Sequence, residues 1–471
     1  MTGRGRMAWR VAGVAVATLV VMAGCSTGTP APDRAAPEGG GSATTAAPLP
    51  AAVTLPPAPS GRSANGLVGT VGSEPGSSVL ARLDPATLQP LAGPRVKLEV
   101  NTVGWSVSPD RSLAVIGDGN GNGLVQVVDL GAMRSLGTVE VGSGSVTLAS
   151  AWLGRRRVAV VLGGMTGPAD AVEVAVLDPV ARKVLTRRTV AGEVSAIGHL
   201  PGGLVLLLTP ARAIGPARLA VVAGRGAVRT VTLERVSAGF KPPKVEGPDA
   251  VGHQRGAGLA VDPAGRRAFV VAPGALVAEV GLDDLAVAYH ALDRPASPLD
   301  RLRRWLLPAA EAKAVDGPWR QAQWAGAGLL AVASGEQRAA KNANGELDQR
   351  ELVSGVELVD TVRWRGYQLH PRASRVDDQG GRLLLSGGTW DSDTSRSIGV
   401  GLTVYGPGDH RPVHLLGRQF VQSVTVRGDL AYVWLTREQS GGYAVVDLRT
   451  GKTLHTGDGD PPILLLGAAA W

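Results

Sequence analysis

The chain has 471 residues, a formal net charge of +8, 65 Gly, 32 Pro and one Cys. A single cysteine excludes an internal disulfide, so the fold must be stabilised by packing. The basic side chains form no evident run or stripe in the sequence, which argues against nucleic-acid binding, and abundant Val, Gly and Thr with sparse Lys and Glu favour an all-β domain.

The N-terminus has the pattern of a secretion signal. Three arginines within the first ten residues precede an apolar run over residues 11–21, which is short for a membrane span. The run is followed by Met22-Ala23-Gly24-Cys25 and so resembles a bacterial lipoprotein signal, in which the cysteine is acylated and becomes the new N-terminus. The alternatives are a plain secretory signal with a chance cysteine and an uncleaved anchor. We expect residues 1–24 to be a signal peptide, and the mature protein to be held on the outer face of the cell membrane by lipid (palmitate) on Cys25.

Residues 25–65 are predicted to form a disordered tether. Residues 26–64 consist mainly of Ser, Thr, Pro, Ala and Gly. They almost lack large apolar side chains, so they cannot bury enough surface to offset the loss of chain entropy. A flexible coil of this length reaches roughly 35 Å and would lift the folded part away from the membrane.

From residue 66 onward one pattern recurs. In its clearest copy the turn Ser108-Pro109-Asp110 introduces an apolar run over residues 113–117, and a second run over residues 124–129 ends in aspartate. Apolar runs that start near residues 67, 113, 158 and 204 repeat with a period of about 46 residues, which is typical of propeller blades. Echoes of the unit stand at Val261-Asp262-Pro263, Val376-Asp377-Asp378-Gln379 and Arg427-Gly428-Asp429.

This period indicates a β-propeller. A sheet of four short antiparallel strands has two apolar faces, and radial stacking of such sheets buries both of them. The Ser108-Pro109-Asp110 unit and its echoes resemble the YVTN and WD40-like propeller repeats of secreted bacterial proteins. The resemblance implies a fold and no particular function. We predict an all-β propeller over residues 66–471 with about eight four-stranded blades. Seven is the alternative, because residues 239–375 are irregular.

Two further features indicate a closed ring of blades. The first unit lacks its innermost strand, which the segment from Pro461 to Leu466 is expected to supply. Several strands also end in an aspartate that can accept hydrogen bonds from the backbone amides of the next turn. These aspartates are Asp84, Asp129, Asp178, Asp283, Asp360 and Asp447.

One segment departs from the β pattern. Ser297 is a candidate N-cap with Pro298 at the first helical position. Leu299, Leu302 and Leu306 then fall on one helical face. We expect a short amphipathic helical insertion over residues 297–308 that packs on the propeller as a clasp. A helix that faces a partner or the membrane is the alternative.

A loop rich in Gly and Asn is the candidate metal site. Asp118, Asn120 and Asn122 alternate with glycines, and Asp129 follows eleven residues after Asp118, which is the spacing of a calcium loop. The same residues suit a hairpin that needs positive φ, because only two carboxylates are present. The hairpin is the favoured interpretation, Ca²⁺ is the alternative, and no other cofactor is expected.

Tryptophan is enriched, with ten Trp against three Phe and five Tyr. Trp105, Trp152 and Trp324 precede inner apolar runs. They are candidates for a ring that stacks on a flat ligand, although packing between blades is the favoured interpretation. The Pro-rich loop that begins at Lys241 contains His253 and Arg255, which are candidate ligand-binding residues because long loops on rigid scaffolds often bind partners.

No catalytic motif is evident in the sequence. The G-x-S-x-G match at residues 24–28 spans the predicted cleavage site, and the histidines do not have metal-ligand spacing. The sequence therefore favours a non-enzymatic cell-surface scaffold that binds an envelope protein or polysaccharide, contacts the membrane through its lipid and binds no nucleic acid. The alternatives are an envelope hydrolase or lyase acting on a sugar, lactone or peptide through carboxylates at the channel mouth, and a sensor of a small ligand.

Overall fold

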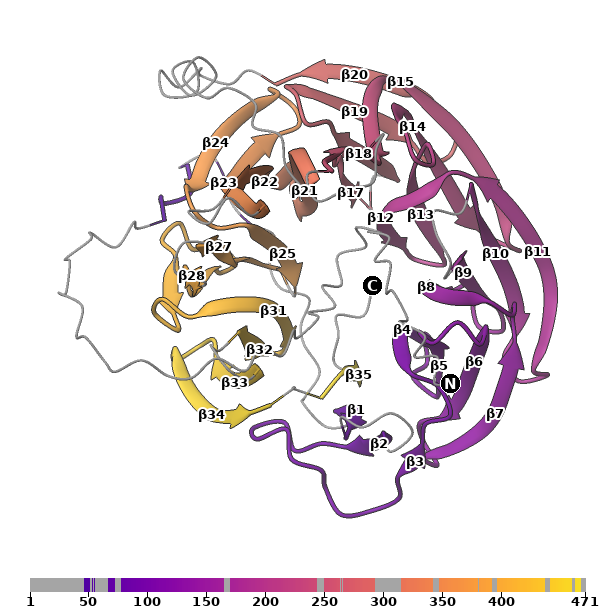
Figure 1. The fold of residues 1–471 in the computed structure, drawn as a ribbon. Coiled ribbons are helices and arrows are strands. Elements are labelled where there is room, and N and C mark those ends of the chain that lie inside the picture. Colours follow the sequence, from indigo (N-terminus) through magenta and orange to yellow (C-terminus); the bar gives the residue numbers. More distant parts are fainter. Residues whose placement is uncertain are drawn as a thin grey trace, which may run out of the picture.

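The computed structural model shows sheets arranged radially in a closed ring (Figure 1). It describes residues 46–50, 53, 55, 67–72, 78–164, 170–243, 250–262, 264, 266–292, 315–341, 347–379, 381–391, 396–436, 441–459 and 462–466. These residues contain β-strands and no α-helix. The predicted all-β propeller is therefore confirmed.

Six sheets contain four antiparallel strands each. The first three comprise β1 (Val68–Val71), β2 (Val79–Arg82) and β3 (Val96–Lys97) with β35 (Leu464–Leu466); β4 (Thr102–Val107), β5 (Leu113–Asp118), β6 (Leu124–Asp129) and β7 (Arg134–Glu140); and β8 (Ser145–Trp152), β9 (Val158–Gly164), β10 (Ala171–Asp178) and β11 (Lys183–Ala191). The other three comprise β17 (Gly258–Asp262), β18 (Arg267–Val271), β19 (Leu276–Gly281) and β20 (Val287–Ala291); β25 (Arg375–Gln379), β26 (Arg382–Ser386), β29 (Leu402–Tyr405) and β30 (Val413–Leu415); and β31 (Phe420–Arg427), β32 (Leu430–Thr436), β33 (Gly441–Asp447) and β34 (Lys452–Asp458).

The remaining strands form a nine-stranded sheet and a two-stranded hairpin. The hairpin consists of β27 (Gly388–Asp391) and β28 (Arg396–Gly399). The nine strands are β12 (Glu193–Leu200), β13 (Gly203–Thr209), β14 (Ile214–Ala223), β15 (Ala227–Lys241), β16 (Gly252–Arg255), β21 (Val315–Gly326), β22 (Leu329–Lys341), β23 (Leu347–Asp360) and β24 (Arg365–His370).

Six separate blades correct the predicted count of eight or seven. The difference arises at β15, which is 15 residues long and pairs through Gly239 to Lys241 with β16. The other edge of β16 pairs in parallel with β21, where Gly252 lies opposite Val315. The runs β12–β15 and β21–β24 are therefore one continuous sheet within the described chain. The sequence showed only that this region is irregular.

The predicted helical insertion at residues 297–308 lies outside the described residues. Within the part of the chain that the structure describes, no helix is long and apolar enough to cross a bilayer.

Apolar side chains fill the spaces between neighbouring sheets. Val115 and Val127 of the β4–β7 sheet, for example, belong to the same buried cluster as Val160 and Trp152 of the β8–β11 sheet. Side chains of a strand alternate between its two faces, so each sheet contributes to the cluster on either side. The described residues thus pack into several small interblade cores.

The ring has two faces, which we name by their contents. The Asp-turn face carries the turns that follow Asp84, Asp129, Asp178, Asp360 and Asp447. Each of these carboxylates accepts hydrogen bonds from backbone amides two or three residues later, as the sequence predicted. Asp283 differs: its carboxylate pairs with Arg266 at 2.8 Å, and Asp284 caps that turn instead.

The opposite face, which we call the extension face, carries strand segments that continue beyond the blades. They are the end of β15, the short strand β16, the β22–β23 hairpin and the β27–β28 hairpin. The β23 and β27 strands contact each other, and the Gln254 side chain of β16 donates to Gln337 of β22 at 2.8 Å. These segments therefore form one joined layer.

The ring is closed by its C-terminal strand, which confirms the prediction for residues 461–466. In β35, Leu464 and Leu466 pair with Gly69 and Val68 of β1. Just before the strand, the Ile463 carbonyl accepts from the Thr70 amide at 3.0 Å. Both ends of the propeller domain thus contribute to one blade.

Part of the predicted tether is packed against the ring. Ala46, Leu49, Val53 and Leu55 are at most 5% exposed and belong to the core between the β21–β24 and β25–β30 strands. The Ala47 and Leu49 amides donate to the Leu369 and His410 carbonyls, both at 2.8 Å. The Tyr405 hydroxyl also donates to the Ala47 carbonyl at 2.6 Å. The prediction of disorder thus does not hold for these residues, because a few apolar side chains suffice to fill a gap between two sheets.

Candidate functional site

The predicted calcium ligands do not surround one centre. Asp118 is 1% exposed, and its two oxygens accept from the Asn101 amide at 3.0 Å and the Asn122 amide at 3.1 Å. Asn120 accepts from the Asn101 side chain at 3.2 Å. Asp129 lies opposite Leu113, at the other end of the β5–β6 hairpin. Among the described residues, no three His, Cys, Asp or Glu side chains are placed to hold a metal ion.

The loop instead has the features of a tight hairpin. Gly123 has a φ of 62°, and a Cβ atom there would lie 1.5 Å from the carbonyl oxygen of Gly142. A side chain would therefore clash with the backbone of the next connection, which explains the glycine-rich composition.

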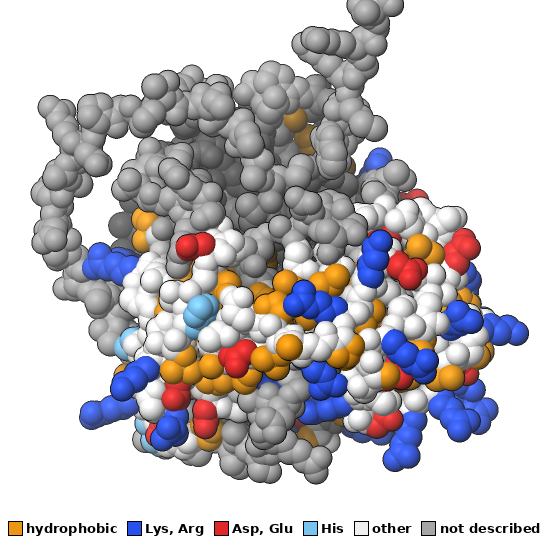
Figure 2. Space-filling model, turned by 90° about the horizontal axis from the view of Figure 1, so that it is seen from below, with side chains coloured by type: hydrophobic (Ala, Val, Ile, Leu, Met, Phe, Trp, Pro, Cys, Tyr) orange, Lys and Arg blue, Asp and Glu red, His pale blue; other side chains and the backbone are white. Residues whose placement is uncertain are grey.

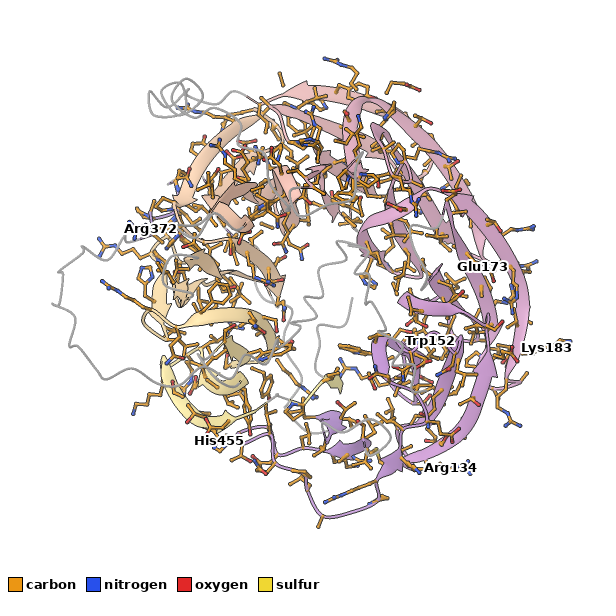
Figure 3. All side chains as sticks on the ribbon, viewed as in Figure 1. Arg134, Trp152, Glu173, Lys183, Arg372 and His455 are labelled. Atoms are coloured by element: carbon orange, nitrogen blue, oxygen red, sulfur yellow. The ribbon has the colours of Figure 1, made fainter. Side chains whose placement is uncertain are left out.

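The three predicted tryptophans lie in three different interblade cores. Trp105 packs near Ile116, and Trp152, at the end of β8 (Figure 3), is 6% exposed among valines. Trp324 stacks on Phe269, with ring centroids 5.5 Å apart and planes within 4°. The structure thus does not bring them together, and these contacts favour the packing interpretation.

His253 and Arg255 lie on β16 in the extension-face layer. Both residues are exposed, and His253 Nδ1 is 3.9 Å from an Asp316 carboxylate oxygen. They are therefore available to a partner on that face. Cys25, the predicted lipidation site, lies outside the described residues.

An ionic and aromatic cluster surrounds Arg267, which the sequence analysis did not single out. Its guanidinium bonds Asp262 at 3.0 Å and Glu279 at 3.1 Å and lies 5.9 Å from the Trp324 ring. Burial alone would lower the pKa of Arg267, but these two hydrogen-bonded carboxylates raise it. The cluster joins the β17–β20 sheet to β21. Its charged groups are paired with one another, so we interpret it as a structural clasp between the two sheets.

The same clasp extends to His290. Its Nε2 lies 3.0 Å from the second Glu279 oxygen, and its ring stacks on Trp364 at 3.8 Å. Since Trp364 follows β23, this contact joins the same two sheets.

A second charged group lies on the inner strand β25. The sequence analysis treated Asp377 and Asp378 as part of a turn, but they lie within the strand, which ends at Gln379. Alternation places Asp377 on the side facing β31, because the neighbouring Gln379 amide bonds Val424 and Val426 of that strand. Asp378 lies on the opposite side.

The surroundings of these two carboxyl groups shift their pKa values towards neutral pH. Burial raises the pKa of Asp377 to about 6, although the nearby Arg375 opposes this effect. Burial, with a smaller contribution from the charge of Asp377, raises the pKa of Asp378 to about 7. Burial also raises the pKa of Glu351, which lies close enough to Arg375 to interact with it electrostatically. The pair of adjacent aspartates shortly before the apolar run of β26 was the available signal in the sequence.

Two histidines are kept neutral by burial. The pKa of His199 on β12 and that of His370 at the end of β24 both fall to about 4, mainly because burial disfavours the charged form. His370 Nδ1 accepts the Ala373 amide at 2.9 Å, so this ring caps a turn.

Comparison with known proteins supports the fold and does not identify a function. No family model matches the chain, and no curated protein does. The structure of the dihydro-heme d1 dehydrogenase NirN in complex with DHE is similar over 89% of this chain and 79% of that chain, with a TM-score of 0.52 and 14% identity. The chain has a β-propeller fold.

Other solved structures match less well. They include Saccharomyces cerevisiae Sqt1, with a TM-score of 0.43, 10% identity and coverage of 78% of this chain and 87% of that one. BamB from Moraxella catarrhalis has a TM-score of 0.40, 12% identity and coverage of 83% and 93%. At such identities a shared propeller carries no information on ligand or reaction.

Proposed function

We propose that this propeller is a non-catalytic binding scaffold of the cell envelope, anchored by lipid on Cys25, which presents its extension face to an envelope protein or polysaccharide. The observation that carries the proposal is the layer formed by β16 and the β22–β23 and β27–β28 hairpins. It adds exposed β-structure to one face of a ring that is otherwise complete. Extensions of this kind on rigid scaffolds commonly carry binding sites.

Exposed apolar side chains on that layer support a protein partner. Ile398 on β28 is 50% exposed and Leu352 on β23 is 38% exposed. The polar and charged residues His253 and Arg255 stand on the same layer. An apolar centre with a polar rim is the usual composition of a protein interface.

The test is capture of envelope components by the acylated protein. The double variant Leu352→Asp with Ile398→Asp is expected to lose a specific component that the parent retains. A matched control, Val413→Asp with Leu454→Asp, alters side chains that are 47% and 48% exposed on outer strands. Equal loss in both variants, or no component that depends on Leu352 and Ile398, would overturn the proposal.

The alternative of an envelope hydrolase or lyase is favoured by one feature, the position of Asp377 and Asp378 on the inner strand β25, where burial raises the pKa of Asp378 to about 7. Such a group can exchange a proton at neutral pH. Against this alternative, Asp377 and Asp378 point to opposite sides of β25 and so cannot flank one bond. Turnover of a sugar, lactone or peptide that is lost in Asp378→Asn would establish the enzyme and remove the scaffold proposal.

A further inference from the structure

The Asp-turn face gathers arginines that are far apart in the sequence. Six hairpin turns, distributed over five sheets, each place one exposed arginine on this face. Because the units repeat, residues that are about 40 to 100 positions apart in the sequence come to lie on one face of the ring. The six are Arg111, Arg182, Arg225, Arg266, Arg363 and Arg449.

Further basic side chains stand at the edges of the same face. Arg155 and Arg156 occupy the turn after β8, and Arg134 and Lys183 begin the outer strands β7 and β11 (Figure 3). Figure 2 views the ring edge-on and shows Lys and Arg side chains that project along its lower margin. Four further basic residues thus accompany the six turn arginines on this face.

The aspartates of these turns reduce this charge only in part. Asp178 and Asp447 hold their carboxylates against backbone amides of their own turns, at 2.8 to 3.2 Å. Asp283 and Asp360 pair with Arg266 and Arg363 at 2.8 and 3.3 Å. At the Asp360 turn the arginine side chain is 68% exposed and the carboxylate side chain 15%, so the outer charge is positive, whereas Arg266 and Asp283 are about equally exposed.

Apolar side chains accompany the arginines at two of the turns. Val180 is 67% exposed two residues before Arg182, and Val362 is 82% exposed directly before Arg363. Valine tips can enter the headgroup layer of a bilayer while neighbouring guanidinium groups remain at the level of the phosphates. A soluble polyanion would offer no such apolar phase, so this combination favours a membrane.

We infer that the Asp-turn face docks on an anionic phospholipid surface and directs the extension face outward. The inference goes beyond the proposed function, and each can fail alone, because docking and partner capture depend on opposite faces. Chain length permits the arrangement. The residues between Cys25 and Ala46 span up to about 70 Å when fully extended, which allows either face to reach the membrane.

The experiment uses the chain from residue 25 onward, which contains every described residue, with Cys25→Ser to remove the acyl group. We expect it to sediment with vesicles of phosphatidylcholine and phosphatidylglycerol, to bind pure phosphatidylcholine vesicles poorly, and to be released at about 0.5 M salt. Equal binding to both kinds of vesicle would overturn the inference.

Two matched variants locate the binding face. The combination Arg111→Gln, Arg182→Gln, Arg225→Gln and Arg449→Gln should weaken partition into anionic vesicles at least about tenfold, since each basic group near such a surface strengthens binding roughly fivefold. The control, which removes four exposed arginines elsewhere, is Arg188→Gln, Arg212→Gln, Arg255→Gln and Arg372→Gln.

The control should change partition less than threefold, and both variants should keep the parent's circular dichroism. Equal weakening by the two variants would contradict face-specific docking. Binding to soluble polyphosphate through the first set of arginines, with no sedimentation with vesicles, would assign the face to a free polyanion and reject the membrane.

Discussion

At the scale of single residues, Gln379 shows how one side chain can join two blades. Its Nε2 donates to the Val424 carbonyl at 2.8 Å, and its Oε1 accepts from the Val426 amide at 2.6 Å. The amide group thereby imitates the backbone of an additional strand between β25 and β31. Both of its partners belong to an inner strand, where a lost hydrogen bond is not easily replaced by water.

Removal of the Gln379 bridge should therefore destabilise the fold. We expect Gln379→Ala to reduce the free energy of unfolding by about 1–3 kcal/mol, because it leaves a backbone donor and an acceptor without their partner. Urea denaturation followed by tryptophan fluorescence measures the change. Gln419→Ala, at an exposed position, is the control. The same loss in both variants would show that the bridge contributes nothing specific.

Asp378 should make stability depend on pH. Its pKa rises from 3.8 to about 7 on folding, so between these values the folded state holds a proton that the unfolded chain has released. Stability from this group therefore falls as pH rises from about 4 to about 7. Between about pH 4 and pH 6.5, the stability contributed by the neutral His199 and His370 rises with pH. The pH dependence of the parent protein is therefore the sum of these opposing contributions.

The effect of Asp378 is isolated by comparing variant with parent. We expect Asp378→Asn to gain unfolding free energy relative to the parent as pH rises from 5 to 8, since the amide avoids burial of a charge. Urea unfolding at each pH measures this difference, and Asp409→Asn on an exposed loop is the control. A difference that is constant with pH would contradict the raised pKa.

At the scale of elements, local patterns were predictable and cross-blade contacts were not. The Asp turns follow from a hydrophobic-Asp pattern whose hydrogen bonds stay within three residues. The closing strand follows from a missing strand in the first unit. The joining of the β12–β15 and β21–β24 runs through β16 depends on how far β15 continues. The inner position of Asp377 depends on where β25 ends. Neither feature follows from the repeat period of the sequence.

The candidate site was harder to predict for the same reason. Trp324 was identified by composition, but its partner Phe269 lies 55 positions away in another sheet, and only the fold shows that they stack. The ring of arginines is an extreme case. Since its members occur one per repeat, no run or stripe marks them in the sequence.

The packed segment around Leu49 is an element whose role can be tested. Leu49 is 4% exposed in the core shared by two blades, so an acid there must lose its hydration or leave the core. We expect Leu49→Asp to detach residues 46–55, with at least tenfold faster amide exchange at Ala47, whose amide bonds Leu369. Hydrogen exchange with mass spectrometry measures this protection.

The adjacent residue provides the control for this change. Pro48 is exposed, so Pro48→Ser should leave exchange at Ala47 nearly unchanged. Unaltered exchange in Leu49→Asp would mean that the backbone hydrogen bonds alone hold the segment.

At the scale of the whole molecule, the ring depends on a contact between residues almost 400 positions apart. The β1–β35 pairing and the Thr70–Ile463 bonds bring the C-terminal segment to the first blade. Ile463 also packs against the core that Val68 and Ile116 share. An open radial array leaves one apolar face of its first sheet and one of its last sheet exposed, and a strand shared between the two chain ends holds these faces together.

A chain that ends at Gly459 therefore lacks the closing strand and should be less stable than one that ends at Leu466, which retains it. We expect a lower unfolding midpoint in urea and early loss of amide protection in β1 and β2, since β1 then becomes an edge strand. Loss of protection should spread from these strands to β4–β7, because the core between the two sheets contains Ile463. If both chains unfold at the same urea concentration, with equal protection of β1, the first blade is stable without closure and the ring is held by interblade cores alone.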